Sequence, residues 1–357
     1  MYAERVKALN PYVPGEQPKD RVYIKLNANE NPYPPSPKVR EALSNFDYSQ
    51  LRRYPDPDAA ELRRAFASIV KVSPDMVYAG NGSDEILSFI FYTFFDDKLP
   101  VVLPVHTYSF YPVYASYYNI PLHKVPLEED FSISIDKLLE PKSCGIIFAN
   151  PNAPTGRFMS LEKLRELLTR YDSNKPVVVD EAYIDFGGET AVPLLKEFHN
   201  LIIIRTFSKS YSFAGARLGF VIAAADVINT FITVKNSFNH FPIDSIVQKL
   251  GIAACEDYDY YKKINAEIAE TRDWFGKELE QLRYEVVPSK ANFIFTKKAG
   301  LSGDEIYKGI KKKGILIRHF NYPGIEDYVR ISIGTREEMN QLLDAVKNLR
   351  MKCEKGI

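Results

Sequence analysis

The chain contains 357 residues, 45% of them hydrophobic and 26% charged, and its 46 Lys and Arg residues balance its 46 Asp and Glu residues. A neutral chain lacks the basic excess that proteins use to bind nucleic acids or anionic membranes, so we expect neither partner and look for a small-molecule ligand. The length predicts about two domains, because a typical domain has roughly 150 residues.

Cysteine usage and the N-terminus bear on the compartment. The three cysteines, Cys144, Cys255 and Cys353, lie far apart and form no Cys-x-x-Cys pattern, so we expect neither a disulfide framework nor a metal site. The first residues carry charges where a signal peptide needs apolar residues, and no apolar run approaches the roughly 18 residues of a membrane span. We therefore expect a cytoplasmic protein.

Residues 1–47 are rich in Pro and Asn, notably in the segment Asn-Ala-Asn-Glu-Asn-Pro at 27–32. This composition favours turns and extended chain over helix. We interpret residues 1–47 as an N-terminal arm that lies on another surface.

Between residues 48 and 240, helical patterns alternate with short apolar runs. The spacing predicts helices beginning near residues 59 and 160, and residues 86–95 suit a buried helix. The runs that fit strands cover residues 76–78, 101–103, 145–148, 177–179, 201–204 and 218–223. Because these runs are apolar at nearly every position, we predict a large α/β domain at 48–240, with a mostly parallel central sheet covered on both faces.

The pattern changes after about residue 240. One long helical pattern covers residues 244–282, and further helical patterns cover 302–313 and 335–349. Strand patterns cover residues 284–287, 292–296, 315–318 and 328–333. Residues 241–357 are therefore predicted to form a smaller C-terminal α+β domain.

Four loops that follow predicted strands carry reactive or polar side chains. In the first, Gly-Asn-Gly-Ser-Asp-Glu at 80–85, a glycine turn leads into a helix whose free N–H groups can hold a phosphate, although an ordinary capped turn explains the segment equally well. In the second, Asp180 ends a buried strand, where it can pair with a cationic nitrogen of a ligand or cap the next helix.

The third loop contains Lys209, between Phe207 and Tyr211. These neighbours favour partial desolvation, which makes the neutral amine accessible and suits a Schiff-base lysine. The alternative is a surface lysine whose stem covers apolar area, but nearby hydroxyls and Arg217, which suit a phosphate, weigh against it. In the fourth loop, Asn152 can present its amide to a ligand, or the turn is only a rigid connection.

Because these loops follow strands of one predicted sheet, their side chains can meet at one edge of it. Together they supply an amine for an aldehyde, an acid for a ring nitrogen, and hydrogen-bond donors for a phosphate. These are the needs of pyridoxal 5'-phosphate, which we expect as the cofactor.

Seven segments carry a resemblance to a known family. They are Leu-Asn-Ala-Asn-Glu-Asn-Pro at 26–32, Arg-Tyr-Pro-Asp at 53–56, Gly-Asn-Gly-Ser-Asp-Glu at 80–85, Asn-Pro-Asn-Ala-Pro-Thr-Gly at 150–156, Val-Asp-Glu-Ala-Tyr at 179–183, Ser-Lys at 208–209 with Arg217, and Tyr-Val-Arg-Ile-Ser-Ile-Gly at 328–334. With these segments the chain resembles the fold-type I pyridoxal-phosphate aminotransferases of class II over nearly its whole length. Within them it is most similar to the members that act on histidinol phosphate.

The resemblance implies that the arm at 1–47 is part of the small domain and of a dimer contact, and that the domain at 48–240 binds pyridoxal phosphate. It also implies roles for individual residues. Lys209 would bind the cofactor covalently and later move a proton, Asp180 would pair with the ring nitrogen, and Tyr108 would stack on the ring. Asn152 and Tyr183 would bind the ring oxygen. The phosphate would be bound by Gly82, Ser83, Asp84, Thr206, Ser208 and Arg217 and, from the neighbouring subunit of a homodimer, by Tyr54. Substrate binding would fall to Tyr12, Asn29, Asn152, Arg318 and Arg330, with a structural ion pair as the alternative for Arg318.

The resemblance also implies a reaction: L-histidinol phosphate and 2-oxoglutarate give 3-(imidazol-4-yl)-2-oxopropyl phosphate and L-glutamate, in histidine biosynthesis. An aromatic amino acid aminotransferase and a threonine-phosphate decarboxylase are the alternatives on the same scaffold, because fold does not determine substrate. A cofactor-binding regulator is disfavoured, since residues 1–47 leave no room for a helix-turn-helix module. His106 and Ala216 depart from the residues common in relatives, which affects the expected pocket shape but removes no needed functional group.

Overall fold

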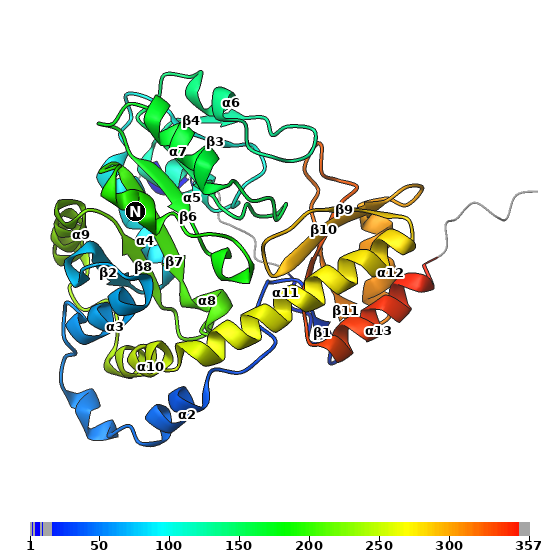
Figure 1. Cartoon of the computed structure of the whole chain (residues 1–357), viewed down its shortest axis with the longest axis horizontal. Coiled ribbons are helices and arrows are strands. Elements are labelled where there is room, and N and C mark those ends of the chain that lie inside the picture. Colours follow the sequence, from blue (N-terminus) through cyan, green and yellow to red (C-terminus); the bar gives the residue numbers. More distant parts are fainter. Residues whose placement is uncertain (1, 3, 8, 10–15, 350–357) are drawn as a thin grey trace, which may run out of the picture.

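The computed structural model describes residues 2, 4–7, 9 and 16–349. Two units are joined by one long helix, which crosses from the larger unit on the left of Figure 1 to the smaller unit on the right. Among the described residues, no helix combines the length and the apolar character needed to cross a membrane.

The larger unit is built on a seven-stranded sheet with the order β2-β8-β7-β6-β5-β3-β4. Its strands are β2 Val77–Gly80, β3 Val101–Pro104, β4 Leu122–Val125, β5 Gly145–Ala149, β6 Val177–Asp180, β7 Leu201–Thr206 and β8 Gly219–Ile222. Neighbouring strands from β4 to β7 are parallel, whereas β8 is antiparallel to both β2 and β7. The expected mostly parallel sheet is confirmed, and all six predicted strands are present. β4 is an additional strand.

Helices cover both faces of this sheet (Figure 1). They are α3 Ala60–Val70, α4 Gly82–Phe94, α5 Tyr111–Tyr118, α6 Ile135–Leu139, α7 Leu161–Arg170, α8 Phe207–Ser210, α9 Ala225–Phe238 and α10 Ser245–Glu256, with short 3-10 turns at Tyr48–Arg52, Pro74–Met76, Ile184–Phe186 and Val192–Lys196. Successive residues of β6 alternate between two hydrophobic clusters, Val177 and Val179 in one and Val178 in the other. This alternation explains why the strand is apolar at every position before Asp180.

The smaller unit contains an antiparallel sheet with the order β12-β13-β10-β9. Its strands are β9 Tyr284–Val287, β10 Phe293–Lys298, β12 Arg318–His319 and β13 Val329–Ser332, and its helices are α12 Gly303–Lys312 and α13 Arg336–Lys347. The predicted strand at 315–318 is divided. β11 Ile315–Leu316 pairs instead with β1 Ile24–Lys25, in a separate two-stranded parallel sheet.

The predicted helix at 244–282 is two helices. α10 ends at Glu256, and α11 Tyr258–Gln281 begins after Asp257, whose backbone leaves the helical region. Tyr261 and Ile264 of α11 belong to a cluster of the larger unit, whereas Ile268 and Phe275 belong to the core of the smaller unit. α11 therefore contributes to both cores, and the boundary near residue 240 stays a prediction.

The described part of the arm is mostly extended, and its β1 strand joins the smaller unit. The composition favoured turns and extended chain over helix, but residues Pro37–Ser44 form the helix α2. Ser36 and a proline at the first helical position provide its start. The Ser36 N–H donates to the Tyr261 hydroxyl at 3.0 Å, which ties α2 to α11.

Candidate active site

The parallel strands β5, β6 and β7 end at one edge of the large sheet, and the predicted site residues follow them there. A cavity of about 630 Å³ lies at this edge. Its lining includes Asn29, Tyr108, Tyr183, Lys209, Arg318 and Arg330. Residues from the arm, the larger unit and the smaller unit thus meet in one place, as expected for a ligand site at the carboxyl ends of an α/β sheet.

Lys209 lies in α8, directly after β7, and is half-buried. Its Nζ donates to the Ala28 carbonyl at 3.1 Å and lies 6.0 Å from the centre of the Tyr183 ring. The arm returns the contact, because the Asn31 side-chain amide donates to the Lys209 carbonyl at 3.0 Å. Both the amine and the backbone of Lys209 are therefore held by the arm at the cavity.

Asp180 ends β6 and is only 4% exposed. Its carboxylate accepts hydrogen bonds from the Tyr111 hydroxyl at 2.9 Å and from the Ala182 N–H at 3.1 Å. Burial raises the pKa of Asp180 to about 6, although these two donors oppose the rise. A buried carboxylate of this kind gains from a positively charged neighbour.

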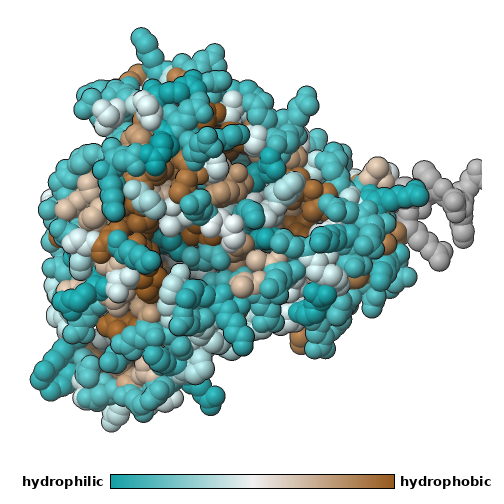
Figure 2. Space-filling model, in the orientation of Figure 1, coloured by the Kyte–Doolittle hydropathy of each residue, from teal (hydrophilic) through white to brown (hydrophobic). Residues whose placement is uncertain are grey.

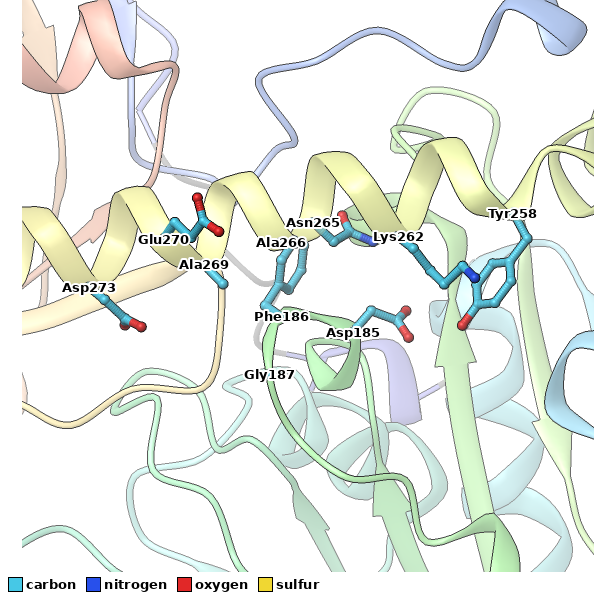
Figure 3. Close-up of a pocket in the computed structure, with 10 residues that line it drawn as sticks. All are labelled: Asp185, Phe186, Gly187, Tyr258, Lys262, Asn265, Ala266, Ala269, Glu270 and Asp273. Carbon is cyan, nitrogen blue, oxygen red and sulfur yellow. The ribbon is translucent and has the colours of Figure 1, made fainter.

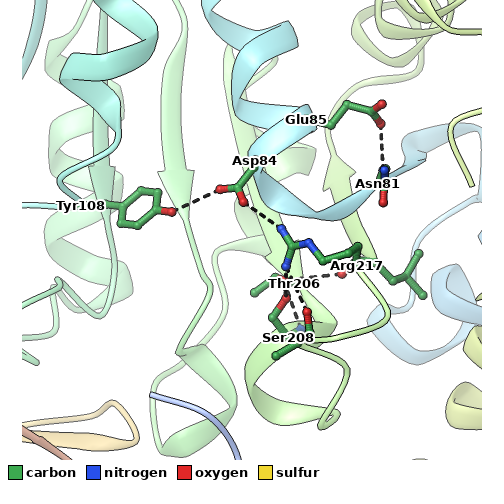
Figure 4. Close-up of polar contacts among 9 residues, drawn as sticks. Asn81, Asp84, Glu85, Tyr108, Thr206, Ser208 and Arg217 are labelled. Carbon is green, nitrogen blue, oxygen red and sulfur yellow. Dashed lines mark hydrogen bonds and ion pairs between the residues drawn. The ribbon is translucent and has the colours of Figure 1, made fainter. Parts of the chain in front are cut away.

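Arg217 and the start of α4 form a polar cradle (Figure 4). Arg217 Nη2 lies 2.8 Å from Asp84 Oδ2, and Nη1 donates to Ser208 Oγ at 3.5 Å. The Thr206 hydroxyl accepts from the Ser208 N–H at 3.2 Å. Gly82 has a positive φ of 79°, and a Cβ there would lie 2.8 Å from Arg217 Nη2, so the cradle requires glycine at this position.

The first-turn amides of α4, including those of Ser83 and Asp84, have no partner within the helix. Such amides, an arginine and two hydroxyls are suited to an anion such as a phosphate. The structure therefore brings together all the residues that the sequence predicted for phosphate binding, apart from Tyr54.

Three further predicted residues surround the centre of the site. The Tyr108 hydroxyl donates to Asp84 Oδ1 at 3.2 Å (Figure 4). Asn152 is fully buried and donates to the His106 carbonyl at 2.9 Å, whereas its Oδ1 has no hydrogen-bond partner. The Tyr183 hydroxyl accepts from Asn29 Nδ2 at 3.0 Å, which links the arm to the loop after β6.

Asn29 is 1% exposed and has a positive φ of 55°, a conformation that Asn tolerates better than most residues. Its N–H donates to Ser332 Oγ at 2.8 Å, and its carbonyl accepts from Asn292 at 3.0 Å. Ser332 and Asn292 were not singled out in the sequence. They fix Asn29 to the smaller unit.

Arg318 and Arg330 are direct cross-strand partners on β12 and β13. Both line the cavity, and Arg330 Nη2 donates to the Asn27 carbonyl at 3.2 Å. Both guanidinium groups also lie near the Phe320 ring, at 5.6 Å and 5.5 Å from its centre. Like charges directly opposite on a sheet are unfavourable without an anion between or beside them, so this pair is suited to an anionic ligand.

Two predicted residues, Tyr12 and Tyr54, are left. Tyr12 is outside the described residues. Tyr54 is 82% exposed, stacks on Phe241 with ring centres 4.5 Å apart, and is not part of the cavity lining. Within the described residues, no group of three or more His, Cys, Asp or Glu side chains is arranged to hold a metal ion.

Comparisons with known proteins define the class of this site. The family model of aminotransferase class I and II matches residues 21–346, and the chain belongs to this family. Among its relatives, the histidinol-phosphate aminotransferase of Syntrophus aciditrophicus (strain SB) is 48% identical, and the match covers 98% of each chain. The histidinol-phosphate aminotransferase of Lactococcus lactis subsp. cremoris (strain MG1363) is 43% identical, and 99% of each chain is covered.

A solved structure agrees with these relatives. The crystal structure of histidinol-phosphate aminotransferase from Sinorhizobium meliloti in complex with pyridoxal-5'-phosphate has a TM-score of 0.88 and 26% sequence identity to this chain. The match covers 98% of this chain and 97% of that one. The fold expected from the sequence, that of the fold-type I pyridoxal-phosphate aminotransferases, is confirmed.

Proposed function

We propose that this protein uses pyridoxal 5'-phosphate to transfer the amino group of L-histidinol phosphate to 2-oxoglutarate, in histidine biosynthesis. The observation that carries the proposal is one cavity lined by Lys209 and by the paired Arg318 and Arg330, at the sheet edge where β6 ends in Asp180. A lysine beside a buried acid suits the cofactor, and two arginines suit an anionic substrate.

The buried polar groups fit this cofactor. Asn152 Oδ1 is fully buried without a hydrogen-bond partner, so a polar ligand group beside it would satisfy it. Asp180 is a buried carboxylate that a protonated ring nitrogen would neutralise. The Arg217 cradle offers charge and hydroxyl donors at one end of the same site, as a phosphate requires.

When bound, pyridoxal phosphate supplies an aldehyde and an electron-withdrawing ring that stabilises negative charge on the substrate α-carbon. The residues of this chain do the rest. Lys209 Nζ can bind the aldehyde, and once released it can take a proton from one carbon and return it to another. Asp180 favours the protonated ring nitrogen, and Tyr183 and Asn152 orient the ring.

The two arginines explain how one cavity can accept two different substrates. Histidinol phosphate carries a phosphate and 2-oxoglutarate carries two carboxylates, and guanidinium groups bind both kinds of anion with paired hydrogen bonds. Both arginines line the same cavity as Lys209, so they place positive charge within it.

A homodimer is part of this proposal. Exposed large hydrophobic side chains include Tyr48, Leu51, Tyr54, Tyr92 and Phe238, all in the larger unit. Figure 2 likewise shows the widest apolar patches of this face over that unit. We propose that a second copy covers such surface and that Tyr54 reaches the phosphate cradle of its partner. A cytoplasmic location agrees with Cys144 and Cys255, which are both free.

The half-reaction with histidinol phosphate tests the proposal directly. Purified protein loaded with pyridoxal phosphate should change its visible absorption when histidinol phosphate is added, and 2-oxoglutarate should reverse the change and yield glutamate. Borohydride reduction should place the cofactor on the peptide that contains Lys209, and Lys209→Ala should lose this adduct. Glutamate formed only with aromatic amino acids, or carbon dioxide released only from phosphothreonine, would overturn the proposed substrate.

A further inference from the structure

A second cluster of charged side chains lies near the end of β6, which carries Asp180, and near α8, which carries Lys209. Arg205 on β7 is 6% exposed, and its Nη2 lies 2.5 Å from Asp185 Oδ1. Arg205 Nη1 lies 3.6 Å from Oε2 of Glu181, which is also buried. Arg205, Asp185 and Glu181 are not among the residues that line the cavity containing Lys209.

Ser210 connects this cluster to the lysine. It directly follows Lys209, is 1% exposed, and donates from its Oγ to Asp185 Oδ2 at 2.6 Å. Asp185 thus uses one carboxylate oxygen for Arg205 and the other for Ser210. Because α8 has only four residues, Phe207–Ser210, its position depends on such side-chain bonds more than on its own backbone bonds.

Glu181 fixes the other strand end. Its Oε1 accepts from the Ala191 N–H at 2.6 Å and its Oε2 from the Thr190 hydroxyl at 2.6 Å. Burial raises the pKa of Glu181 to about 7, and the charge of Arg205 opposes the rise. Glu181 directly follows Asp180, so its bond to the Ala191 N–H, which does not depend on the Thr190 side chain, holds the backbone at this strand end.

A second cavity borders this cluster. A separate cavity of about 360 Å³ lies between α11 and the turn at Ile184–Phe186, with Asp185 facing Tyr258 and Lys262 across it (Figure 3). Glu270 and Asp273 also line this cavity. Asp185 therefore borders this cavity while its carboxylate is bonded to Arg205 and Ser210.

We propose that Ser210, Asp185 and Arg205 are positioning residues that fix the direction of the Lys209 amine relative to Asp180, by tying the ends of β6 and β7 together. This inference rests on the proposed function, because it concerns Lys209 as the residue that binds the cofactor covalently. It assigns these side chains no contact with cofactor or substrate.

Two hydroxyl deletions separate positioning from general stability. Ser210→Ala and Thr190→Ala each remove one 2.6 Å hydroxyl-to-carboxylate bond of the cluster, but only Ser210 adjoins Lys209. Cofactor-free protein of each variant is mixed with pyridoxal phosphate. The first measurement is the rate at which a borohydride-reducible adduct forms on Lys209, and the second is the pH midpoint of the visible absorption. Thermal melting serves as the stability readout.

We expect Ser210→Ala to slow adduct formation roughly 10-fold, since small misplacements of a reacting group are costly, and to shift the pH midpoint by about half a unit or more. Both variants should melt at a lower temperature than wild type. Thr190→Ala should nevertheless keep the wild-type rate of adduct formation and the wild-type pH midpoint. Ser210→Thr retains the hydroxyl and should restore both values.

The inference is overturned if Ser210→Ala shows the rate and midpoint of Thr190→Ala while wild-type protein forms the adduct on Lys209. If wild-type protein forms no adduct there, the proposed function itself fails. Should Ser210→Ala not fold, Asp185→Asn decides by the same two measurements, because asparagine keeps the shape of the side chain but loses the charge that faces Arg205.

Discussion

At the scale of the residue, Asp180 shows a conflict between stability and chemistry. Its carboxylate is buried, and burial raises its pKa from 3.8 to about 6. Above pH 6 the folded protein must therefore hold an ionised carboxylate away from water, which favours unfolding unless a positive charge lies beside it. Such strain is expected where a group is retained for function.

Asp180→Asn should consequently stabilise the cofactor-free protein at neutral pH. The raised pKa destabilises the folded state by about 3 kcal/mol above pH 6, since each unit is worth about 1.4 kcal/mol. This penalty declines as pH falls from 6 towards 4 and is absent below the unfolded value. The variant should thus melt at a higher temperature than wild type at pH 8 and lose that advantage at pH 4.

The same variant should lose turnover on the order of 100-fold or more, because a neutral amide no longer favours the protonated ring nitrogen. Melting curves of cofactor-free protein across this pH range, with single-turnover rates of loaded protein, check both parts. An equal stability change at pH 4 and pH 8 would show that the ionisation of Asp180 is not its origin.

Arg330→Lys tests the anion site. Lysine keeps the charge but not the paired N–H groups, so we expect the KM of both histidinol phosphate and 2-oxoglutarate to rise roughly 10-fold or more. Histidinol without its phosphate should be much less affected. An unchanged KM for both anions would remove Arg330 from the substrate site.

The sequence predicted the site residues that follow strand ends, because parallel strands bring their carboxyl ends to one edge. It did not predict Tyr111, whose hydroxyl donates to Asp180, or Ser332, which binds Asn29. Tyr111 lies within a helix, and Ser332 is over 300 positions from Asn29, so only the packed structure reveals these pairs. Of the cluster near Lys209, only Glu181 appeared in a recognised segment, and with no role.

At the scale of the element, continuous apolar runs made most strands predictable. β4 was missed because its burial is mixed, with His123 and Lys124 exposed, as suits the edge strand of a sheet. The sequence predicted one strand at 315–318. It could not show the division, because β11 and β12 differ in the strands they pair with, β1 and β13, which are distant in sequence from one another. The break between α10 and α11 was missed because the helical spacing of the sequence continues through Asp257, although the backbone leaves the helical region there.

Helix α13 provides a prediction about local stability. Thr335 caps it in a capping box, accepting from the Glu338 N–H while Glu338 accepts from the Thr335 N–H. Thr335→Ala should lower the free energy of unfolding by about 1 kcal/mol and leave turnover unchanged, because Thr335 does not line the cavity. Thr169→Ala, which removes a hydroxyl within α7, is a matched control with a smaller effect. A large loss of turnover in Thr335→Ala would contradict this view of α13.

At the scale of the whole molecule, the site is assembled from three regions that are distant in sequence. The arm reaches the smaller unit through β1 and Asn29, and it contacts Lys209 of the larger unit through Ala28 and Asn31. Arg330 lies on β13 of the smaller unit and Lys209 on α8 of the larger unit. A shift between the units would therefore change the distance between these two side chains. Composition and periodicity predict such units separately but contain no information about how they are oriented.

The last prediction concerns two copies of the molecule. If Tyr54 acts across an interface, a mixed dimer of Lys209→Ala and Tyr54→Ala subunits contains one site with both residues intact. Equal amounts, unfolded and refolded together, should then recover about one quarter of the wild-type sites by random pairing. The assay uses a cofactor concentration that saturates wild type but not Tyr54→Ala. Separately refolded variants, mixed afterwards, are the control. If Tyr54 serves its own subunit, co-refolding gives no more turnover than this control, because no mixed pair then holds a complete site.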